Sequence, residues 1–252
     1  MAVFYEQFGK IGEGPLLVFI HGGGAGGWMW EKQVSHFCDY HCIVPTLQGH
    51  GVRSEEGTFS IRDNAQELID LIETERAGRT VHIIGFSIGA QIALEMLNLA
   101  PHLAQTAMVN SALLRPMAWA KPFIRPSIRI TMPLIRNRAF AKMQAKQLYL
   151  DEEYFDRYYE DSVKMKAGTL IDMLRENLSF TIPKGVSNSS TSILATAGMK
   201  ERNSVIQSAK QLTALRPDWH CLLVPGIGHG FPIARPDLFN QTVEKWLAEH
   251  IV

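Results

Sequence analysis

A serine lies at the centre of a five-residue pattern that can support nucleophilic chemistry. Residues 85–89 read G-F-S-I-G, which fits the pattern G-x-S-x-G. The apolar run 81–84 before it predicts a strand, and residues 90–97 after it predict a helix. A strand, a sharp turn and a helix are the context in which this motif presents a reactive hydroxyl. So tight a turn requires small residues two positions either side of Ser87. The sequence therefore predicts that Ser87 is a nucleophile.

A serine hydroxyl needs a base within hydrogen-bond reach, and a carboxylate best orients that base. In an open parallel sheet, such groups gather beyond the carboxyl ends of the strands. Two further predicted strands end near suitable residues. Residues 192–196 lead to Glu201, and residues 221–224 lead to His229, which has a glycine on each side. The three candidates occur in the chain order serine, acid, histidine.

A glycine-rich loop follows another predicted buried strand. The apolar run 16–20 ends at His21, and glycine dominates residues 22–27 before the aromatic pair Trp28 and Trp30. So many glycines after a buried strand indicate positive φ angles or a close approach of the backbone to another group. We expect the aromatic pair to fix the loop, and we expect Trp28 and Phe86 to contact a substrate.

Strand and helix patterns alternate along most of the chain. The predicted strands lie within residues 3–10, 16–20, 42–45, 81–84, 107–110, 192–196 and 221–224. Between them fall helical patterns, the clearest of which starts at Ser60, where Asp63 completes a pattern like a capping box. This alternation predicts an α/β fold with a mostly parallel sheet and helices on both faces.

The alternation stops between residues 111 and 186, which predict an inserted helical cap on a core domain of residues 1–110 and 187–252. The first part of the insertion is basic: Arg115, Lys121, Arg125, Arg129, Arg136, Arg138, Lys142 and Lys146. An acidic run follows: Asp151, Glu152, Glu153, Asp156, Glu160 and Asp161. The basic run fits a solvated face that partly pairs with the acidic run. A membrane-surface patch and an anion-binding rim are the alternatives.

Four stretches carry a resemblance to a known family. They are the loop from His21 to Trp28, residues 48–51 (Q-G-H-G), residues 85–89, and residues 228–230 (G-H-G). They occur in the family's order over nearly the whole chain. The sequence resembles the α/β-hydrolase superfamily, in its esterase-like branch with a helical cap after the sixth strand. The loop pattern H-G-x-x-x-G-x-W-x-W is also similar to that of plant methylesterases and hydroxynitrile lyases.

The resemblance implies roles for the candidate residues. Ser87 would be the nucleophile, and His229 the general base and then the general acid. The acid would be Glu201, in a G-x-x-E match to the family's usual G-x-x-D. Some relatives carry the acid near the position of Asn110, which supplies no charge, and Asp218 is a less favourable substitute because it precedes the last strand.

The family's oxyanion hole consists of backbone N–H groups. By position these belong to Ile88 and Gly23, with Gly24 as an alternative to Gly23. Such donors act because they already point at the oxygen that becomes negative.

These expectations define a serine hydrolase that cleaves a small, apolar ester or related acyl compound through an acyl-enzyme. The alternatives are a carbon–carbon bond hydrolase, a lyase, a cofactor-free haloperoxidase, and a non-catalytic ligand sensor. No metal or organic cofactor is implied. An apolar cavity is suggested by Phe123, Met132, Phe140, Met143, Tyr149, Tyr154 and Phe155. Arg115 and Arg125 would favour acidic substrates.

The overall composition points to a small-molecule partner. The 252 residues carry a formal net charge of zero, so nothing global favours nucleic acid. The chain has no apolar run of the roughly 20 residues that a spanning helix needs, and residues 1–6 show no signal-peptide pattern. Cys38, Cys42 and Cys221 lack metal-ligand spacing. We expect Cys42 and Cys221 to be buried thiols, which favours a cytoplasmic setting.

Overall fold

A seven-stranded sheet in the order β1-β3-β2-β4-β5-β6-β7 forms the centre of the computed structural model. The model describes residues 3–250, so residues 1–2 and 251–252 of the predicted core domain lie outside the described part. β1 runs antiparallel to β3, and the other neighbouring pairs are parallel. The strands are β1 (Tyr5–Gly9), β2 (Leu16–Ile20), β3 (His41–Pro45), β4 (Val81–Phe86), β5 (Thr106–Asn110), β6 (Ser192–Gly198) and β7 (His220–Val224).

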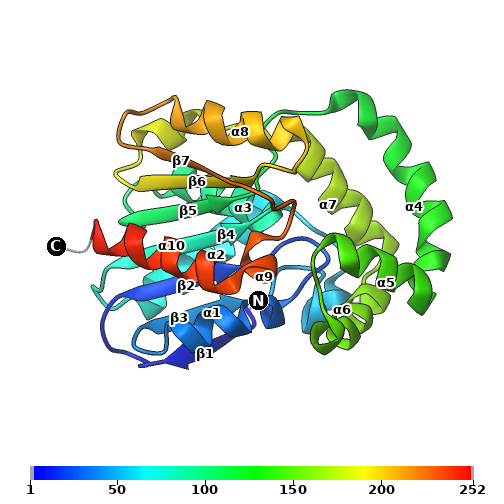
Figure 1. Cartoon of the computed structure of the whole chain (residues 1–252), viewed down its shortest axis with the longest axis horizontal. Coiled ribbons are helices and arrows are strands. Elements are labelled where there is room, and N and C mark those ends of the chain that lie inside the picture. Colours follow the sequence, from blue (N-terminus) through cyan, green and yellow to red (C-terminus); the bar gives the residue numbers. More distant parts are fainter. Residues whose placement is uncertain (1–2, 251–252) are drawn as a thin grey trace.

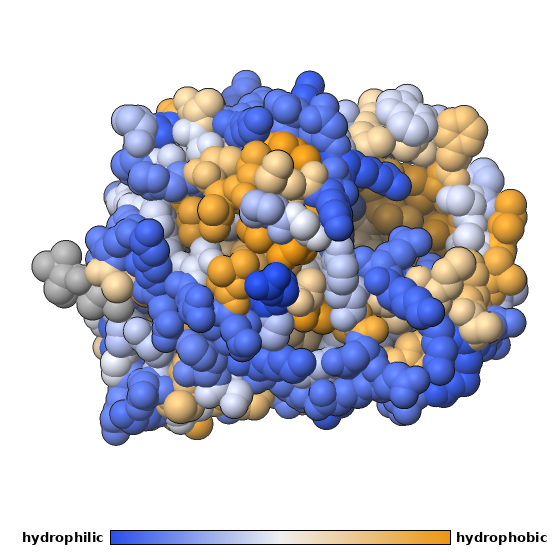
Figure 2. Space-filling view, viewed as in Figure 1, coloured by the Kyte–Doolittle hydropathy of each residue, from blue (hydrophilic) through white to orange (hydrophobic). Residues whose placement is uncertain are grey.

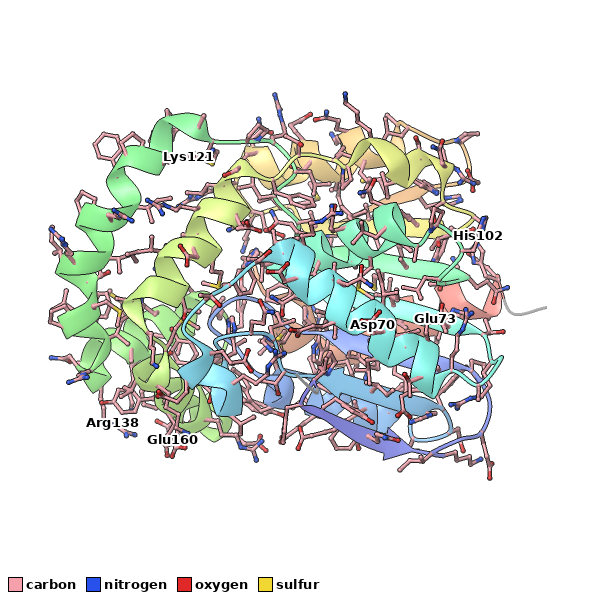
Figure 3. The ribbon with its side chains drawn as sticks, turned by 180° about the vertical axis from the view of Figure 1, so that it is seen from behind. Asp70, Glu73, His102, Lys121, Arg138 and Glu160 are labelled. Atoms are coloured by element: carbon pink, nitrogen blue, oxygen red, sulfur yellow. The ribbon has the colours of Figure 1, made fainter. Side chains whose placement is uncertain are left out.

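Helices cover both faces of this sheet. They are α1 (Glu31–His36), α2 (Ile61–Glu75), α3 (Ile88–Leu99), α4 (Lys121–Ile135), α5 (Arg138–Gln147), α6 (Glu152–Lys164), α7 (Ala167–Ser179), α8 (Asn203–Thr213), α9 (Phe231–Ala234) and α10 (Pro236–Ala248). Short 3-10 helices span Gly27–Trp30, Gly51–Glu56, Ala118–Ala120 and Lys184–Asn188. Figure 1 shows α10 in front of the sheet, and Figure 3, from behind, shows α2 with Asp70 and Glu73 crossing the other face.

The apolar residues of β2 show why helices cover both faces of the sheet. Leu16 and Val18 belong to one buried cluster, with α2, α3 and α8. Leu17 and Phe19 belong to a second cluster, with α1 and α10. Successive side chains of a strand point to opposite faces, so a strand that is apolar throughout must be buried on both. The predicted α/β fold, with a mostly parallel sheet and helices on both faces, is confirmed.

The topology brings several loops together at one edge of the sheet. The chain passes from β2 to β3 on one side and then returns to place β4 on the other side of β2. At such a switch point, the loops beyond the carboxyl ends of adjacent strands diverge and leave a crevice. The loops after β2, β4, β5, β6 and β7 all leave at this edge. They carry the glycine-rich segment, Ser87, Ser111, Glu201 and His229.

In the chain, helices α4 to α7 come after β5 and before β6. In space they extend beyond one end of the sheet (Figure 1). They have a small apolar cluster of their own, which includes Ala141, Tyr154, Phe155 and Tyr158. α7 also contributes Met173 to the main core cluster. We propose, as the sequence predicts, that residues 111–186 form a cap on a core of residues 1–110 and 187–252.

Local signals in the sequence placed most elements correctly. Ser60 caps α2, because its hydroxyl accepts a hydrogen bond from the Asp63 amide at 3.2 Å. The expectation that Cys221 is buried is wrong: Cys42 is buried but Cys221 is exposed. β7 is the last strand of the sheet and its first three residues are exposed, so an apolar run at an edge does not imply burial. Within residues 3–250, no helix is long and apolar enough to cross a membrane.

The turn between β4 and α3 has no space for larger side chains. Ser87 itself has a positive φ of 56°. A Cβ atom on Gly89 would lie 2.4 Å from the Ile20 carbonyl oxygen and 2.5 Å from that of His21. A Cβ atom on Gly85 would lie 2.6 Å from the Gly89 oxygen. The two glycines therefore let α3 start directly against β2.

We predict that Gly89→Ala lowers the free energy of unfolding by about 1–3 kcal/mol, the usual cost of forcing an extra carbon into a packed interior. Gly168→Ala is the matched control. It lies in α7, where an added Cβ would meet nothing closer than 3.5 Å, so it should stabilise by about 0.5–1 kcal/mol. Urea unfolding of both variants measures the difference. Equal stability of the two would contradict the packing argument.

Candidate active site

Ser87 and His229 lie within hydrogen-bond distance although 142 residues separate them. Ser87 stands between β4 and α3, and its amide donates to the Asn110 carbonyl at 2.8 Å. His229 lies in the loop after β7. Its Nε2 atom is 3.1 Å from Ser87 Oγ. The His229 side chain is 37% exposed, so a small molecule can reach the pair.

The Glu201 carboxylate holds the other side of the imidazole. Its Oε2 atom is 2.8 Å from His229 Nδ1. Its Oε1 atom accepts from the Ser111 hydroxyl at 2.7 Å and from the Gly198 amide at 3.0 Å. Because the carboxylate accepts at Nδ1, the neutral imidazole carries its proton there, and Nε2 is free to accept from Ser87.

Glu201 is buried but stays ionised. Its side chain is only 1% exposed. Burial raises the pKa of this carboxyl, but the hydrogen bonds from His229, Ser111 and Gly198 outweigh it, and the net pKa is lowered. The two other positions considered for the acid, Asn110 and Asp218, have different partners. The Asn110 amide donates to Thr196 Oγ1 at 2.6 Å, and Asp218 pairs with Arg216.

Ser111 is a supporting residue that the sequence analysis missed. It follows Asn110 directly and has a positive φ of 57°. The family pattern drew attention to the end of β5 only as a position for an acid. The only sequence signal for this role was a serine directly after the last residue of β5. Ser111 contacts Glu201 because β5 and β6 are neighbours in the sheet.

Two of the backbone N–H groups predicted for the oxyanion hole donate to no acceptor within residues 3–250. One is that of Ile88, the first residue of α3, which has no acceptor within its own helix. The other is that of Gly23. The Gly24 amide, the alternative, donates to His50 Nε2 at 3.1 Å. An added Cβ on Gly23 would lie 2.6 Å from Met173 Sδ and 3.6 Å from Ile88 Cγ2, so Met173 of α7 packs against this point.

Two buried histidines hold the glycine-rich loop. His21 Nδ1 donates to the Gly22 carbonyl at 2.8 Å, and its Nε2 accepts from the Leu47 amide at 3.1 Å. His50 accepts from Gly24 and, through Nδ1, donates to the Gln48 carbonyl at 2.9 Å. Burial lowers the pKa of His21 to about 3, with a further contribution from His50. Burial likewise lowers the pKa of His50 to about 4. Both rings are therefore neutral near pH 7.

A cap tyrosine supports the His229 loop. The Tyr149 hydroxyl accepts from the Gly228 amide at 2.8 Å. An added Cβ on Gly228 would lie 3.0 Å from that oxygen, and one on Gly230 would lie 2.9 Å from the Leu148 carbonyl oxygen. Tyr149 has a positive φ of 61°, which is costly for a bulky residue. The glycines on both sides of His229 therefore make room for the end of α5.

A cavity of about 530 Å³ contains the serine and histidine. Its walls are Ser87, Ser111, Leu113, Met117, Gln147, Leu148, Leu174, Asn177, Leu178, Lys200, Glu201, Arg202, Ser204, Val205 and His229. Neither of the two expected substrate contacts is among them. Trp28 instead donates to Asp161 of α6 at 2.8 Å. Phe86 is buried, and its ring centroid lies 4.9 Å from that of His229.

The apolar residues of segment 111–186 that were predicted to form the cavity do not line it. None of the seven apolar cap residues proposed to form it is among its walls. Phe123 and Met143 are exposed, whereas Tyr154 and Phe155 fill the cap's own core. Arg115 and Arg125 are also not among its walls. The cations that line it are Lys200 and Arg202, from the loop between β6 and α8.

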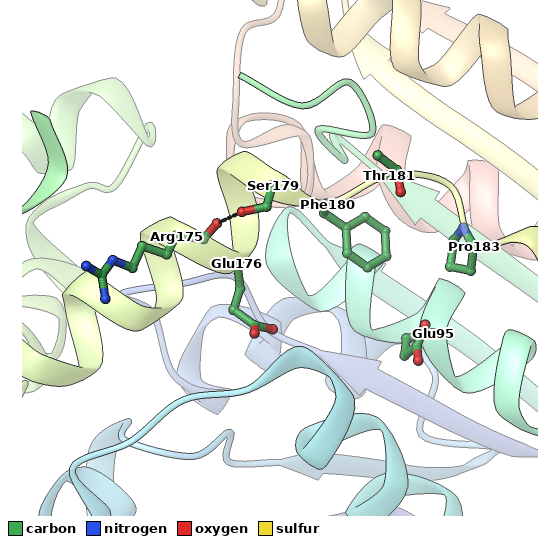
Figure 4. A pocket seen from close by; sticks show the side chains of 7 residues that line it. All are labelled: Glu95, Arg175, Glu176, Ser179, Phe180, Thr181 and Pro183. Atoms are coloured by element: carbon green, nitrogen blue, oxygen red, sulfur yellow. Dashed lines mark hydrogen bonds between the residues drawn. The ribbon is translucent and has the colours of Figure 1, made fainter. Parts of the chain in front are cut away.

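A second cavity, of about 390 Å³, lies between α3 and α7 (Figure 4). Its two carboxylates already have partners. Glu176 accepts from the Ile61 amide at the start of α2 at 2.7 Å, and Glu95 pairs with Arg62 at 3.2 Å. Figure 4 shows the Ser179 hydroxyl of this cavity donating to the Arg175 carbonyl, and the residues that line the cavity include no histidine. The cavity at Ser87 is therefore the candidate active site.

The fold and this constellation together define a class of enzyme. Residues 17–242 match the model of the Alpha/beta hydrolase family. The chain belongs to that family.

Curated relatives match parts of the chain. A protein of Gibberella zeae described as an AB hydrolase superfamily protein is 32% identical over 112 residues, which are 43% of this chain and 38% of that protein. A pimeloyl-(acyl-carrier protein) methyl ester esterase of Methylococcus capsulatus is 31% identical over 102 residues, 40% of this chain and 37% of that enzyme. The chain thus matches less than half the length of these relatives.

Solved structures match over nearly the full length. BpoC of Mycobacterium tuberculosis H37Rv, described provisionally as a non-heme bromoperoxidase, superposes with a TM-score of 0.83 at 20% identity, covering 100% of this chain and 97% of that one. The esterase EaEST of Exiguobacterium antarcticum gives a TM-score of 0.81 at 18% identity, covering 98% and 95%. At such identities the likeness shows the fold.

We predict that Tyr149→Phe speeds hydrogen exchange of the segment around Gly228. The variant removes one acceptor, whose net worth is about 0.5–1.5 kcal/mol, which corresponds to a roughly 2- to 12-fold faster exchange. Exchange followed by mass spectrometry measures it. Tyr159→Phe is the control, because that hydroxyl donates to the Arg136 carbonyl within the cap. Unchanged exchange around Gly228 would contradict a supporting role for Tyr149.

We also predict that stability falls as the pH drops from 7 to 5. The folded-state pKa values of His21 and His50, about 3 and about 4, lie below the ordinary value of 6.5. The unfolded chain therefore takes up protons that the folded protein does not, and each ring costs about 2 kcal/mol over this range. Urea unfolding at several pH values tests this. His50→Gln should flatten the dependence and His102→Gln, at an exposed position, should not.

Proposed function

We propose that the protein is a serine hydrolase that cleaves a small ester through an acyl-enzyme. The observation that carries this proposal is the unbroken hydrogen-bond path from Ser87 through His229 to Glu201, with distances of 3.1 and 2.8 Å. The path lies in a cavity that solvent can enter. Nucleophile, base and orienting carboxylate are the three parts that acyl transfer to serine requires.

The proposed reaction starts with attack of Ser87 Oγ on the ester carbonyl carbon. His229 Nε2 takes the hydroxyl proton, and Glu201 stabilises the imidazolium that forms. The N–H groups of Gly23 and Ile88 donate to the negative oxygen, and each such donor typically lowers the barrier by about 3 kcal/mol. His229 then gives the proton to the leaving alcohol. Water, activated by the same histidine, releases the acid and restores Ser87.

The cavity suits a compact, mostly apolar acyl group. Leu113, Met117, Leu174 and Leu178 form much of its wall, and Met173 covers the proposed oxyanion site at Gly23. Relatives named as esterases, among them the methyl ester esterase of Methylococcus capsulatus and EaEST, support ester bonds as the substrate class.

We predict that a fluorophosphonate probe labels Ser87 and that mass spectrometry finds the adduct on that residue. Ser87→Ala should lose both the labelling and ester hydrolysis, because no other hydroxyl lies at His229 Nε2 in residues 3–250. Glu201→Gln should slow ester hydrolysis roughly 10⁴-fold, as loss of the orienting carboxylate does elsewhere. Ser204→Ala is the control, since this serine lines the same cavity but is not among the hydrogen-bond partners of His229 in residues 3–250.

Labelling of Ser204, or full esterase activity in Ser87→Ala, would refute the assignment. A folded protein with a labelled Ser87 but no turnover of any ester would shift the proposal to another reaction of the same residues. A screen of carbon–carbon substrates would then follow.

A further inference from the structure

The outer side of α4 exposes large apolar side chains. Trp119, in the short helix just before α4, is 70% exposed. Phe123 is 64% exposed, Ile130 is 71% exposed and Leu134 is 42% exposed. Single exposed apolar residues are ordinary, but a group of four on neighbouring turns marks an interaction surface.

These side chains share one face of the helix. Their spacing of four, seven and four residues keeps them within one stripe, since residues three, four and seven apart lie on the same side. Ile124 and Ile128, on the opposite side, are buried. Figure 1 places α4 at the outer edge of the cap, and Figure 2 shows apolar side chains along that edge. We call this stripe, formed by Trp119, Phe123, Ile130 and Leu134, the α4 stripe.

Cations lie on another exposed side of α4, one or two residues from members of the α4 stripe, and have no matching acids. Lys121, Arg125, Arg129 and Arg136 are exposed, and no aspartate or glutamate occurs from residue 115 to residue 150. Part of the basic run does pair with the acidic run, as Arg138 does with Asp156. The four cations of α4 form no ion pair with any described residue. Their charge is therefore available to a partner.

The charge decides between the candidate partners. A second copy of the chain, docked stripe to stripe, would add four more unpaired cations to the same region without any acid from residues 115–150 to offset them, and this excess charge opposes such a contact. An anionic lipid surface satisfies both features, because apolar side chains enter the acyl boundary while lysine and arginine reach the headgroups. A tryptophan beside cations is also the composition that membrane interfaces favour.

The first residue of the α4 stripe follows a wall of the cavity at Ser87. Met117, two residues before Trp119, is one of the cavity's walls. α4 packs against α7, whose Leu174 and Leu178 line the same cavity. A membrane that contacted α4 would therefore lie one helix away from the α7 wall of the cavity and close to its Met117 side.

We propose that the α4 stripe and its cations form a peripheral docking surface for membranes that contain anionic lipid. The proposal concerns binding and stands whether or not the protein proves to be an esterase. The helix lies in the plane of the headgroups with the four apolar side chains inserted, and the cations hold it there electrostatically.

Sedimentation with sucrose-loaded vesicles tests the proposal on the full chain. We expect binding to phosphatidylcholine vesicles that contain phosphatidylglycerol, weak binding to phosphatidylcholine alone, and release at high salt. Arg125→Gln with Arg129→Gln should weaken binding roughly 30-fold, which corresponds to about 1 kcal/mol for each charge. Phe123→Ser with Ile130→Ser should weaken it at least as much, because two inserted side chains are lost.

Controls separate docking from a general surface effect. Leu215→Ser, at a position that is 47% exposed beyond α8, and Lys210→Gln, in α8, should leave vesicle binding unchanged. Circular dichroism checks that each variant is folded. No binding to the anionic vesicles, or equal loss in the control variants, would overturn the proposal. A dimer in sedimentation equilibrium that Phe123→Ser with Ile130→Ser dissolves, without vesicle binding, would assign the surface to a second copy instead.

Discussion

The backbone of Ser87 is the constraint on which the rest of the site depends. Its φ of 56° is costly for a residue with a side chain, and it persists because β4 and α3 hold both ends of the turn. The start of α3 fits against β2 only because Gly89 has no Cβ. The same turn gives the hydroxyl its position 3.1 Å from His229 and leaves the Ile88 amide without a helical acceptor.

Three buried side chains around this turn are paired with backbone groups or with other side chains. Glu201 tolerates burial because three donors reach its two oxygens. His21 and His50 tolerate it because they stay neutral and hold loop amides and carbonyls. Each paired group fixes a loop in the position that the proposed chemistry needs, so stability and the geometry of the site have the same origin.

The cap contributes support as well as cover. Tyr149 holds the loop of His229 through Gly228, Met173 lies over Gly23, and Trp28 of the glycine-rich loop reaches Asp161 of α6. None of these contacts leaves a readable pattern in the sequence, because each joins residues more than a hundred positions apart or a side chain to a backbone amide. The apolar composition of the cap was equally ambiguous, since the same residues could fill its core, line a cavity or, as on α4, face outward.

The sequence by itself determined what depends on neighbours along the chain. Apolar runs defined the strands, Ser60 marked the start of α2, and the glycine pattern marked the turn at Ser87. The order of strands and their loops was enough to bring Ser87, Glu201 and His229 into one prediction. Only the tertiary structure decided which side chains support these residues, because Ser111 reaches Glu201 across neighbouring strands. It also decided which apolar runs are exposed, because burial depends on what covers a strand, as the exposed Cys221 on an edge strand shows.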